Sequence, residues 1–571
     1  MDGPTKISAF ILFIGVLVFV HELGHFLAAK LFGVKVLKFS LGFGPPLLQF
    51  TRGETTYQIA AVPLGGYVRM HGDDPTQSEE ERAADPDRAR SFNNAPISHR
   101  AVIALAGPAF NLVFPIICFF AYFLLGPKVY APVVGIVDPS RPAAASALEP
   151  GDRVLEVAGT SVYSFDRMRE VVSRHPGEAI ELVVDRDGER VRTTVVPDEA
   201  PDQNLFGEPI ARGVIGVHLN AFGNRLGVAD QGRSPPGVQT GDAILAVDQE
   251  HIDSWSGLRS ALRRRAGMEA KLRIARPDPR RLGDVLSAEA PAPFELSLVV
   301  PEDGEPASLG WAPGSQFVRT VAEGGPADRA GIRAGDQVWA VDGHRTINFA
   351  SFAGRILEAE GEAIEVELRR DGEAVAFRFD PEAISCVHEN TKKPTTEQQL
   401  GFGRRLVSDG APCADLARAQ WADAAWHSSA PVPIEEAELS IAEAFMSSVR
   451  ETGGVIYNTL RGIFKLFTNE VSVENVGGPV RLFQLASQAA ELGLLVYLGI
   501  LASVSVNLGL VNLLPIPVFD GGHLLLLLIE AIKRKPLSVR TREYANLFGL
   551  MFIISLFVLA MRNDILALDA F

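Results

Sequence analysis

Four long apolar stretches, two towards each end of the chain, constrain what this sequence can fold into. A membrane-spanning helix needs about 20 mostly apolar residues, because the hydrocarbon core of a bilayer is about 30 Å thick. Such stretches occupy approximately residues 7–31, 101–125, 494–514 and 547–561, and the last is short for a span. The mean hydropathy of +0.14 and the 22% of charged residues fit neither a wholly soluble nor a wholly embedded protein. The sequence therefore predicts a multi-pass α-helical membrane protein of about four spans, with a large polar insert.

Basic residues in the short loops predict how these spans are oriented. Loops rich in lysine and arginine stay on the cytoplasmic side. The basic residues after the first and third stretches are Lys30, Lys35, Lys38, Lys533, Arg534, Lys535, Arg540 and Arg542. Both loops are therefore expected in the cytoplasm, and residues 127–490 outside it. The first stretch continues past His21 without a small-residue cleavage site, which predicts a retained span rather than a signal peptide.

Charge and cysteine content exclude some classes of partner and leave one question open. The formal net charge is −15, with no basic stripe that would indicate nucleic-acid binding. Cys118 lies in an apolar run, where we expect it only to pack. Cys386 and Cys413 share one polar segment outside the predicted cytoplasmic side. A disulfide is chemically possible there, and two free thiols are the alternative.

A histidine pair lies inside the first apolar stretch, in the five residues HELGH that begin at His21. His21 and His25 are four apart, so on a helix they share one face, which is the spacing that two zinc ligands need. Glu22 lies beside them as a candidate general base. The alternative is a chance pattern, but an unpaired glutamate at membrane depth is costly. A bound Zn²⁺ ion supplies the opposite charge, so the pattern indicates a zinc site.

A third ligand is needed, because catalytic zinc takes three protein ligands and leaves the fourth position to water. The best candidate is Asp520, in the segment NLLPIPVFDGGHLL. Pro515 and Pro517 cannot continue a helix, and broken backbone at membrane depth is tolerated only inside protein or along a wet cavity. The alternatives are that Asp520 caps the following helix or belongs to a plain turn, or that His523 is the ligand. The apolar segment 523–532 is too short to cross the membrane and is expected to be a half-helix.

This set of residues predicts amide hydrolysis without a covalent intermediate. A zinc ion held by two neutral histidines and one aspartate lowers the pKa of its water to about 7. Glu22 would accept the proton of that water and later deliver it to the leaving amine.

The polar insert contains a repeat with a period of about 90 residues. Gly-Asp pairs begin at Gly151, Gly241 and Gly335, and each is followed by a strand, a turn, a helical stretch and a strand pair. This arrangement resembles a PDZ domain. We expect three PDZ-like α+β domains at 130–200, 205–301 and 306–381. They would be followed by a polar linker or insert at 382–440 and an amphipathic external helix region at 441–490, between membrane regions at 1–126 and 491–571.

Several further motifs accompany the histidine pair and carry a family resemblance. They are GFGP (42–45), PLGGYVRM (63–70), SFNN (91–94), AGPAFN (106–111), VGGPV (476–480) and SVNLGLVNLLPIPVFDGGH (505–523). With HELGH, they resemble the bacterial site-2 proteases, specifically the RseP-like intramembrane metalloproteases. The resemblance implies zinc as cofactor, His21, His25 and Asp520 as its ligands, and Glu22 as the catalytic base. The substrate-binding residues that it implies are Asn507, Asn512, Pro515, Pro517, Gly65, Gly66 and Tyr67.

Substrate handling follows from the same comparison and from hydrogen bonding. A helical substrate hides its peptide bonds, and once unwound in a membrane it needs new hydrogen-bond partners. Residues 34–70 read as β-hairpins with Gly and Pro turns, and the matching segment of the family is a re-entrant β-loop. A strand edge of this loop can bind the substrate by β-addition.

The resemblance implies regulated intramembrane proteolysis in the bacterial inner membrane. Expected substrates are single-span membrane proteins, such as anti-sigma factors already cut on the outside, or remnant signal peptides. The active site would face the cytoplasm, and periplasmic PDZ-like domains would filter substrates by size. Three such domains plus the 382–440 insert depart from the usual one or two, which leaves the admission of substrates open.

Two other functions compete with this interpretation. A catalytically silent membrane scaffold would use the PDZ-like repeats to gather partners, but it has no need of the HELGH residues and Asp520 at membrane depth. A metalloprotease of external peptides is disfavoured, because the motif lies near the cytoplasmic face and the large insert outside.

Overall fold

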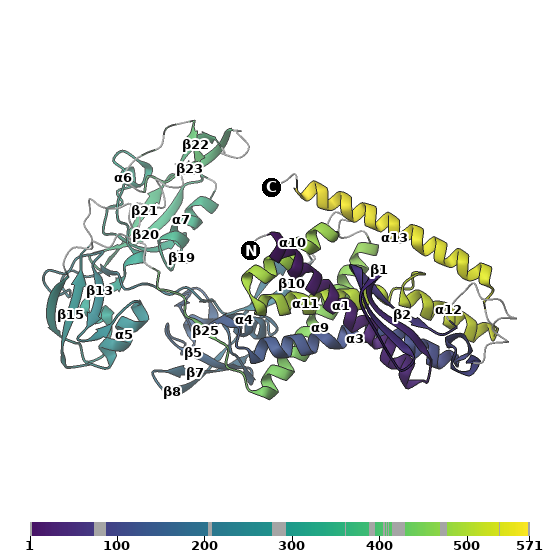
Figure 1. The fold of residues 1–571 in the computed structure, drawn as a ribbon. Coiled ribbons are helices and arrows are strands. Elements are labelled where there is room, and N and C mark those ends of the chain that lie inside the picture. Colours follow the sequence, from purple (N-terminus) through teal and green to yellow (C-terminus); the bar gives the residue numbers. More distant parts are fainter. Residues whose placement is uncertain are drawn as a thin grey trace. The chain divides into compact units, whose positions relative to one another are not determined.

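The computed structural model describes most of the chain and divides it into two compact units (Figure 1). Unit 1 comprises residues 1–127 and 436–571, and unit 2 residues 128–435. The described residues are 3–72, 87–203, 208–276, 293–359, 361–387, 394–402, 406, 408, 410–413, 429–468, 477–535 and 537–568. Each unit is described by itself.

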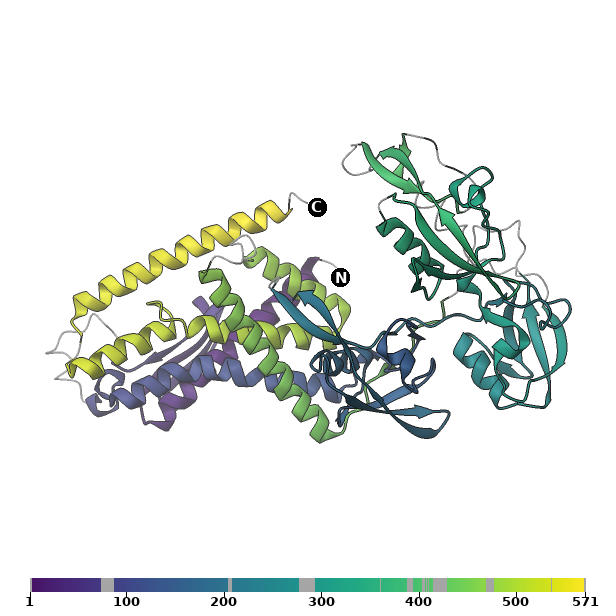
Figure 2. The ribbon, with the colours of Figure 1, turned by 180° about the vertical axis from the view of Figure 1, so that it is seen from behind.

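Four helices of unit 1 are long and apolar enough to cross a membrane. They are α1 (Gly3–Leu31), α3 (Ile97–Leu124), α11 (Leu494–Asn512) and α13 (Val539–Leu568). This confirms the predicted number of spans. The apolar part of the fourth runs from Arg540 to Leu566, so it is longer than the predicted 547–561. Helix α3 packs against both α1 and α11 (Figure 2).

The segment between the third and fourth spans contains a shorter helix, α12 (Asp520–Lys533), of 14 residues. It is too short to cross a bilayer, as expected for a half-helix. Two more helices, α9 (Ile441–Phe467) and α10 (Pro479–Leu492), occupy the region predicted to be amphipathic helix. Asp564 of α13 accepts the backbone N–H groups at the start of α10, at 2.8 Å from Gly478 and 2.9 Å from Val480.

Two long strands, β1 (Val36–Arg52) and β2 (Thr55–Met70), form the predicted β-structure of unit 1. Both strands bend, so that residues 38–41 of β1 pair with two segments of β2, one on each side. Leu41, for example, pairs with both Ile59 and Gly66. Glycines allow the bends, and Gly42 and Gly44 have φ of +88° and +92°. Residues 66–70 pair with β1 on one side and with no other strand among the described residues, so they form an edge.

Unit 2 contains three four-stranded sheets with the same order of strands, each accompanied by one helix (Figure 1). Repeat 1 consists of β5 (Arg153–Val157), β6 (Thr160–Ser161), α4 (Phe165–Ser173), β7 (Ile180–Arg186) and β8 (Glu189–Val195). Repeat 2 consists of β13 (Ala243–Val247), β14 (Glu250–His251), α5 (Trp255–Arg263), β15 (Glu269–Ala275) and β16 (Phe294–Val299). Repeat 3 consists of β18 (Gln337–Val341), β19 (His344–Arg345), α7 (Phe349–Glu358), β20 (Ile364–Arg370) and β21 (Glu373–Phe379).

Short elements connect and complete these sheets. They are β3 (Lys128–Tyr130), β4 (Ile136–Val137), β9 (Asp198–Gln203), β10 (Pro209–Val214), β11 (Val217–His218), β12 (Leu226–Val228), β17 (Trp311–Pro313), α6 (Pro326–Arg329) and β25 (Ile434–Glu436). Strand β9 pairs with β10, β4 with β11, and β12 with β17.

The repeated Gly-Asp pair of the sequence has one structural role in all three repeats. Its aspartate is 1–2% exposed and binds, through both carboxylate oxygens, the arginine that lies 34 residues later. The pairs are Asp152–Arg186, Asp242–Arg276 and Asp336–Arg370, with N–O distances of 2.7–2.8 Å. A buried carboxylate needs such a partner, since an uncompensated buried charge is strongly destabilising. The motif therefore marks a structural ion pair.

Each repeat also receives a returning segment that the predicted domain boundaries missed. The segments share an apolar–glycine–apolar pattern around Gly216, Gly310 and Gly401, whose φ angles are +79°, +72° and +73°. Their apolar residues Ile215, Leu309 and Leu400 lie in the cores of repeats 1, 2 and 3. The predicted ends at 200, 301 and 381 are therefore too early, and part of the predicted linker 382–440 belongs to repeat 3. The hydrophobic runs are too short to mark these segments in the sequence.

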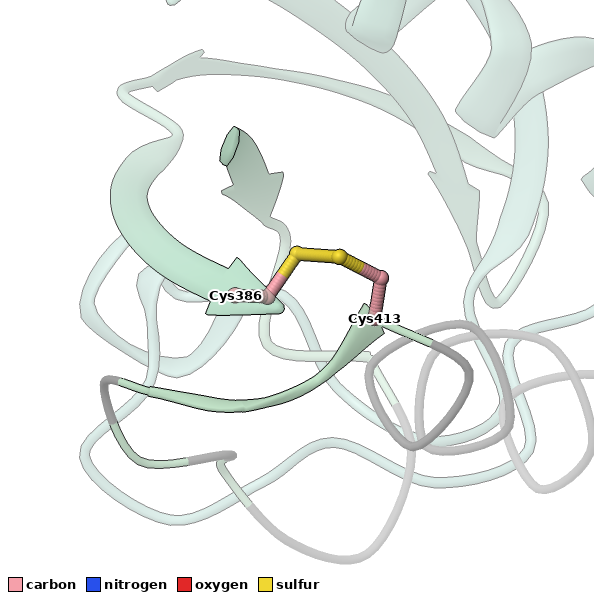
Figure 3. The surroundings of a disulfide bond; sticks show 2 residues. All are labelled: Cys386 and Cys413. Atoms are coloured by element: carbon pink, nitrogen blue, oxygen red, sulfur yellow. A yellow bond between two sulfur atoms is a disulfide. The ribbon is translucent and has the colours of Figure 1, made fainter. Parts of the chain in front are cut away.

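The disulfide question is answered in the same region (Figure 3). A three-stranded sheet of β22 (Glu382–Val387), β23 (Pro394–Gln399) and β24 (Ala411–Pro412) follows repeat 3. Cys386 and Cys413, 27 residues apart, form a disulfide at this sheet, and Cys118 is a buried free thiol. The bridge closes a loop that contains the core residues Leu400 and Phe402, so it ties the returning segment to repeat 3.

Candidate metal centre

Two elements far apart in sequence bring three metal-binding side chains together in unit 1. His21 and His25 lie one turn apart on α1, and their Nε2 atoms are 3.2 Å apart. Asp520, the first residue of α12, places Oδ2 3.1 Å from His21 Nε2 and Oδ1 3.4 Å from His25 Nε2. The three form the one group of this kind among the described residues. Asp520 makes no side-chain capping bond at the start of α12, in contrast to the capping alternative.

The geometry of these three side chains fits a tetrahedral zinc ion. Zinc binds imidazole nitrogen and carboxylate oxygen at about 2.0–2.2 Å, so two tetrahedral ligand atoms lie about 3.3 Å apart. The two imidazole Nε2 atoms match this value at 3.2 Å. Asp520 presents a different oxygen to each histidine, Oδ2 at 3.1 Å to His21 and Oδ1 at 3.4 Å to His25, and one ligand atom from each of the three residues lies within 4.8 Å of the others. The donor set of two imidazoles and one carboxylate is also that of a catalytic site that keeps its fourth position open.

Residues of helix α3 contact Nδ1 of each imidazole, the ring nitrogen that does not face Asp520. The Nδ1 of His25 lies 2.8 Å from the carbonyl oxygen of Ile103. The Nδ1 of His21 lies 3.1 Å from Nδ2 of Asn111, a fully buried residue whose Oδ1 has no partner in the described part of the chain. Metal binding through Nε2 requires a hydrogen on Nδ1, and a half-turn of the Asn111 amide presents Oδ1 to that hydrogen. This rotation gives the buried oxygen a partner, which supports metal binding by His21.

The chain between α11 and α12 shapes the aspartate side of the site. Gly521 and Gly522 allow this loop to pack on the start of α12, because an added Cβ would lie 2.3 Å from the carbonyl oxygens of Leu513 and Ile516. Val518 has φ of +89°, which is a strained backbone conformation for a β-branched residue. Strain of this kind persists only where surrounding structure fixes it, so the position of Asp520 is closely determined.

A cavity of about 530 Å³ opens beside the three side chains. Glu22 lies in its wall, together with Gly66 and Tyr67 of the β2 edge and Asn512 at the end of α11. Glycine is required at residue 66, because an added Cβ would lie 2.7 Å from Val18 Cγ1 and 2.8 Å from the carbonyl oxygen of Ser40. The edge strand, the acid and the three metal-binding side chains therefore share one chamber.

Other predicted residues lie at or outside the margin of this chamber. His523 lines the cavity but does not belong to the group of three. Gly65 and Pro517 each adjoin a lining residue in the sequence, Gly66 and Val518, and neither they nor Pro515 belong to the wall. Asn507 lies outside it, and its Oδ1 accepts a hydrogen bond from Thr459 at 2.6 Å.

Sequence reasoning gave no role to three residues near the site. Asn111 belongs to the motif AGPAFN. Its polar side chain at membrane depth is the feature of the sequence that could have indicated a role. The contribution of Ile103 is a backbone carbonyl, which no side-chain pattern reveals. Arg100 lines the cavity one turn before Ile103, and its signal is a cation at the start of an apolar stretch.

Comparison with known proteins identifies the family of this chain. The model of peptidase family M50 matches residues 9–556, which is nearly the whole chain. The chain belongs to peptidase family M50. It is 28% identical to the regulator of sigma-E protease RseP of Escherichia coli, over 98% of each chain. It shares the same identity and coverage with the regulator of sigma E protease of Salmonella typhi. A protein of Pasteurella multocida that is named as a zinc metalloprotease is 27% identical over the full length of both chains.

Membership of family M50 establishes the class of the protein. It is a zinc metalloprotease of the site-2 type, and four apolar helices with a β-rich insert make it a multi-pass membrane protein. The resemblance to RseP-like proteases predicted from the sequence motifs is thereby confirmed.

Proposed function

We propose that the chain hydrolyses peptide bonds within transmembrane segments of single-span proteins, with zinc held by His21, His25 and Asp520. The observation that carries this proposal is the convergence of three zinc-type side chains from α1 and α12, whose ligand atoms lie within 4.8 Å of one another. Glu22 lies in the same cavity, on the turn of α1 that carries both histidines.

The protein groups divide the chemistry between them. Bound zinc supplies a Lewis acid that makes water a nucleophile near neutral pH and polarises the peptide carbonyl. Glu22 is the general base that accepts a proton from the attacking water and then gives it to the leaving nitrogen. As the C–O bond forms and the C–N bond breaks, the products are a carboxylate and an amine. His523, in the same wall, is a rival ligand that this assignment leaves unused.

The β2 edge is the proposed binding surface for the unwound substrate. Residues 66–70 have a strand partner on one side alone among the described residues, and Gly66 and Tyr67 line the cavity that contains Glu22. An extended peptide added to this edge has its backbone hydrogen bonds satisfied inside the membrane. Asn512 lines the same cavity and offers an amide to the substrate backbone. The β1–β2 pair then corresponds to a re-entrant loop.

The repeats of unit 2 are proposed as PDZ-like domains that restrict access by size. One strand order, one helix and one buried Asp–Arg pair in each repeat support a shared fold. The disulfide supports a location outside the cytoplasm, since disulfides persist in oxidising compartments. The protein would lie in a bacterial inner membrane with its active site towards the cytoplasm. Relatives named as regulators of sigma-E suggest anti-sigma factors already cut outside as substrates, with remnant signal peptides as the alternative.

The test uses purified protein in detergent with a model transmembrane peptide. We expect wild type to bind zinc and cleave, Glu22→Gln to bind zinc without cleaving, and Asp520→Ala to lose both. Ser555→Ala serves as a control, because Ser555 is exposed on α13 and lies outside the cavity wall. If wild type holds no zinc, or if Glu22→Gln cleaves normally, the assignment fails and a non-catalytic scaffold becomes the better account.

A further inference from the structure

A second group of charged side chains lines the cavity that holds the candidate metal site. Glu530 of α12 is 3% exposed and lies between Arg100 of α3 and Arg542 of α13. Arg100 Nη2 is 3.1 Å from Glu530 Oε2, and Arg542 donates to Oε1. Glu530 Oε1 also accepts the backbone N–H of Leu537 at 3.1 Å. One buried carboxylate thus holds three helices together.

The charges of this group do not balance. Two guanidinium groups face one carboxylate, and arginine stays protonated in proteins. The Arg100 side chain is 10% exposed, and its Nε has no hydrogen-bond partner among the described residues. The structural pairs of unit 2 hold one arginine for each buried aspartate. The one positive charge that this group of three has in excess favours a ligand that brings a carboxylate to the two guanidinium groups.

The distance of this group from the candidate metal site follows from the helices that carry both. Glu530 follows Asp520 by ten residues on α12, which is about 15 Å at 1.5 Å per residue. The backbone of Arg100 lies nearer, about 4.5 Å along α3 from Ile103, but its guanidinium is at Glu530, 3.1 Å from Oε2, so Glu530 sets the distance. An extended peptide covers about 15 Å in four or five residues. A substrate strand with its scissile bond beside Glu22 therefore reaches the arginines within that number of residues.

We propose that Arg100 and Arg542 form a specificity subsite for a carboxylate of the substrate, four or five residues from the bond that is cut. Guanidinium groups bind carboxylates through two parallel hydrogen bonds, and Glu530 fixes the orientation of both. The carboxylate is either an aspartate or glutamate side chain or the end of a chain that was cut before. The inference rests on the proposed function, because the distance is counted from the proposed site of cleavage.

The test compares matched transmembrane peptides that carry Glu or Gln at each position from two to six residues on either side of the scissile bond. The readout is the ratio of kcat/KM for each Glu peptide to that for its Gln partner. We expect a preference of about tenfold for Glu at one position four or five residues away, as for a hydrogen-bonded charge pair. Peptides that end there with a free carboxylate or an amide separate the chain end from the side chain.

Two variants and a control connect this preference to the arginines. In Arg542→Gln the ratio should fall to about one, and Arg100→Gln should behave alike if it folds, as judged by its zinc content. Arg540→Gln, an exposed neighbour outside the cavity wall, should keep the preference. A wild-type ratio near one at every position, or a preference that survives Arg542→Gln, overturns the proposal.

A binding measurement keeps this test independent of the proposed function. The Kd of each peptide for the Glu22→Gln protein should show the same ratio of about tenfold. If wild type cleaves no peptide but the binding ratio is present and depends on Arg542, the subsite stands and the proposed cleavage fails. If cleavage occurs and both ratios are near one, the cleavage stands and the subsite fails.

Discussion

The repeat aspartates of unit 2 and Asp520 of unit 1 differ in what neutralises them. Each of the three repeats of unit 2 holds its buried aspartate with Nε and Nη2 of one arginine. In unit 1, Asp520 faces two histidines, and no lysine or arginine lies within ion-pair distance of it among the described residues. A carboxylate with a guanidinium partner is complete within the protein. A carboxylate and two imidazoles whose ligand atoms converge are complete only with a cation from outside.

The largest expected effect is on stability, and it comes from breaking the Asp336–Arg370 ion pair of repeat 3. Asp336→Asn removes the charge that Arg370 binds, and we expect repeat 3 to lose about 4 kcal/mol, the scale for breaking a buried pair. Hydrogen exchange of the full-length protein should show lost protection in repeat 3 with unchanged zinc content. Asp371→Asn, an exposed neighbour, is the control. A loss of zinc in Asp336→Asn would remove the distinction between structural and metal-binding carboxylates.

The disulfide tests the stability of repeat 3 by another route. Replacing Cys386 and Cys413 with alanine opens a loop of 27 residues, for which chain entropy predicts a loss of about 3 kcal/mol. The loss should be confined to repeat 3, because Leu400 and Phe402 of its core lie in that loop. Reduction of the wild-type protein should give the same pattern of hydrogen exchange, with repeat 1 as internal control. Equal loosening of repeat 1 would contradict this assignment.

Asn111→Leu tests the support of the metal site from α3. The substitution leaves the Nδ1 of His21 without its partner, and we expect zinc affinity to fall about 10- to 100-fold, as for other residues that orient a ligand. Competition with a chelator measures the affinity without reference to activity. Asn111→Asp keeps an acceptor for Nδ1–H and should bind zinc more tightly than Asn111→Leu. Equal affinities of the two variants would show that Asn111 only packs.

The smallest expected effect is a pH dependence in unit 2. Burial opposes the ionisation of Glu149, yet Arg263, Arg259 and Arg186 hold its pKa below the ordinary 4.5. The ionised Glu149 therefore contributes fully to the free energy of unfolding above about pH 4.5. This contribution is lost as the pH falls through the lower pKa of the folded state. We expect about 1 kcal/mol, because the side chain is partly exposed. Denaturation of wild type and Glu149→Gln between pH 3 and 6 checks this by giving the free energy of unfolding at each pH. The same dependence on pH in both proteins would contradict it.

Much of the fold could be predicted because its signals are local. Apolar length marked all four spans, and the recurrent Gly-Asp pair marked three repeats of one strand order. The two histidines could be paired from the sequence, because a spacing of four residues places His21 and His25 on one face of a helix. Asp520 followed from the broken helix before it. These features depend on period and charge, which a sequence shows directly.

The remainder depends on contacts between distant segments. The returning segments around Gly216, Gly310 and Gly401 are short, so their place in the three cores appears only in the structure. Ile103 contributes through its backbone, and Asn111 through a contact with a residue 90 positions away. The Arg100–Glu530–Arg542 group joins three helices in the same manner.

Zinc coordination in the full-length protein tests the central claim most directly. X-ray absorption of the purified protein, together with its metal content, reports the number and kind of ligands. The account predicts one zinc per chain, with two imidazole nitrogens and one carboxylate oxygen at about 2.0–2.2 Å, and loss of this signal in Asp520→Ala. No bound zinc, a sulfur ligand at about 2.3 Å, or a spectrum unchanged in Asp520→Ala would contradict it.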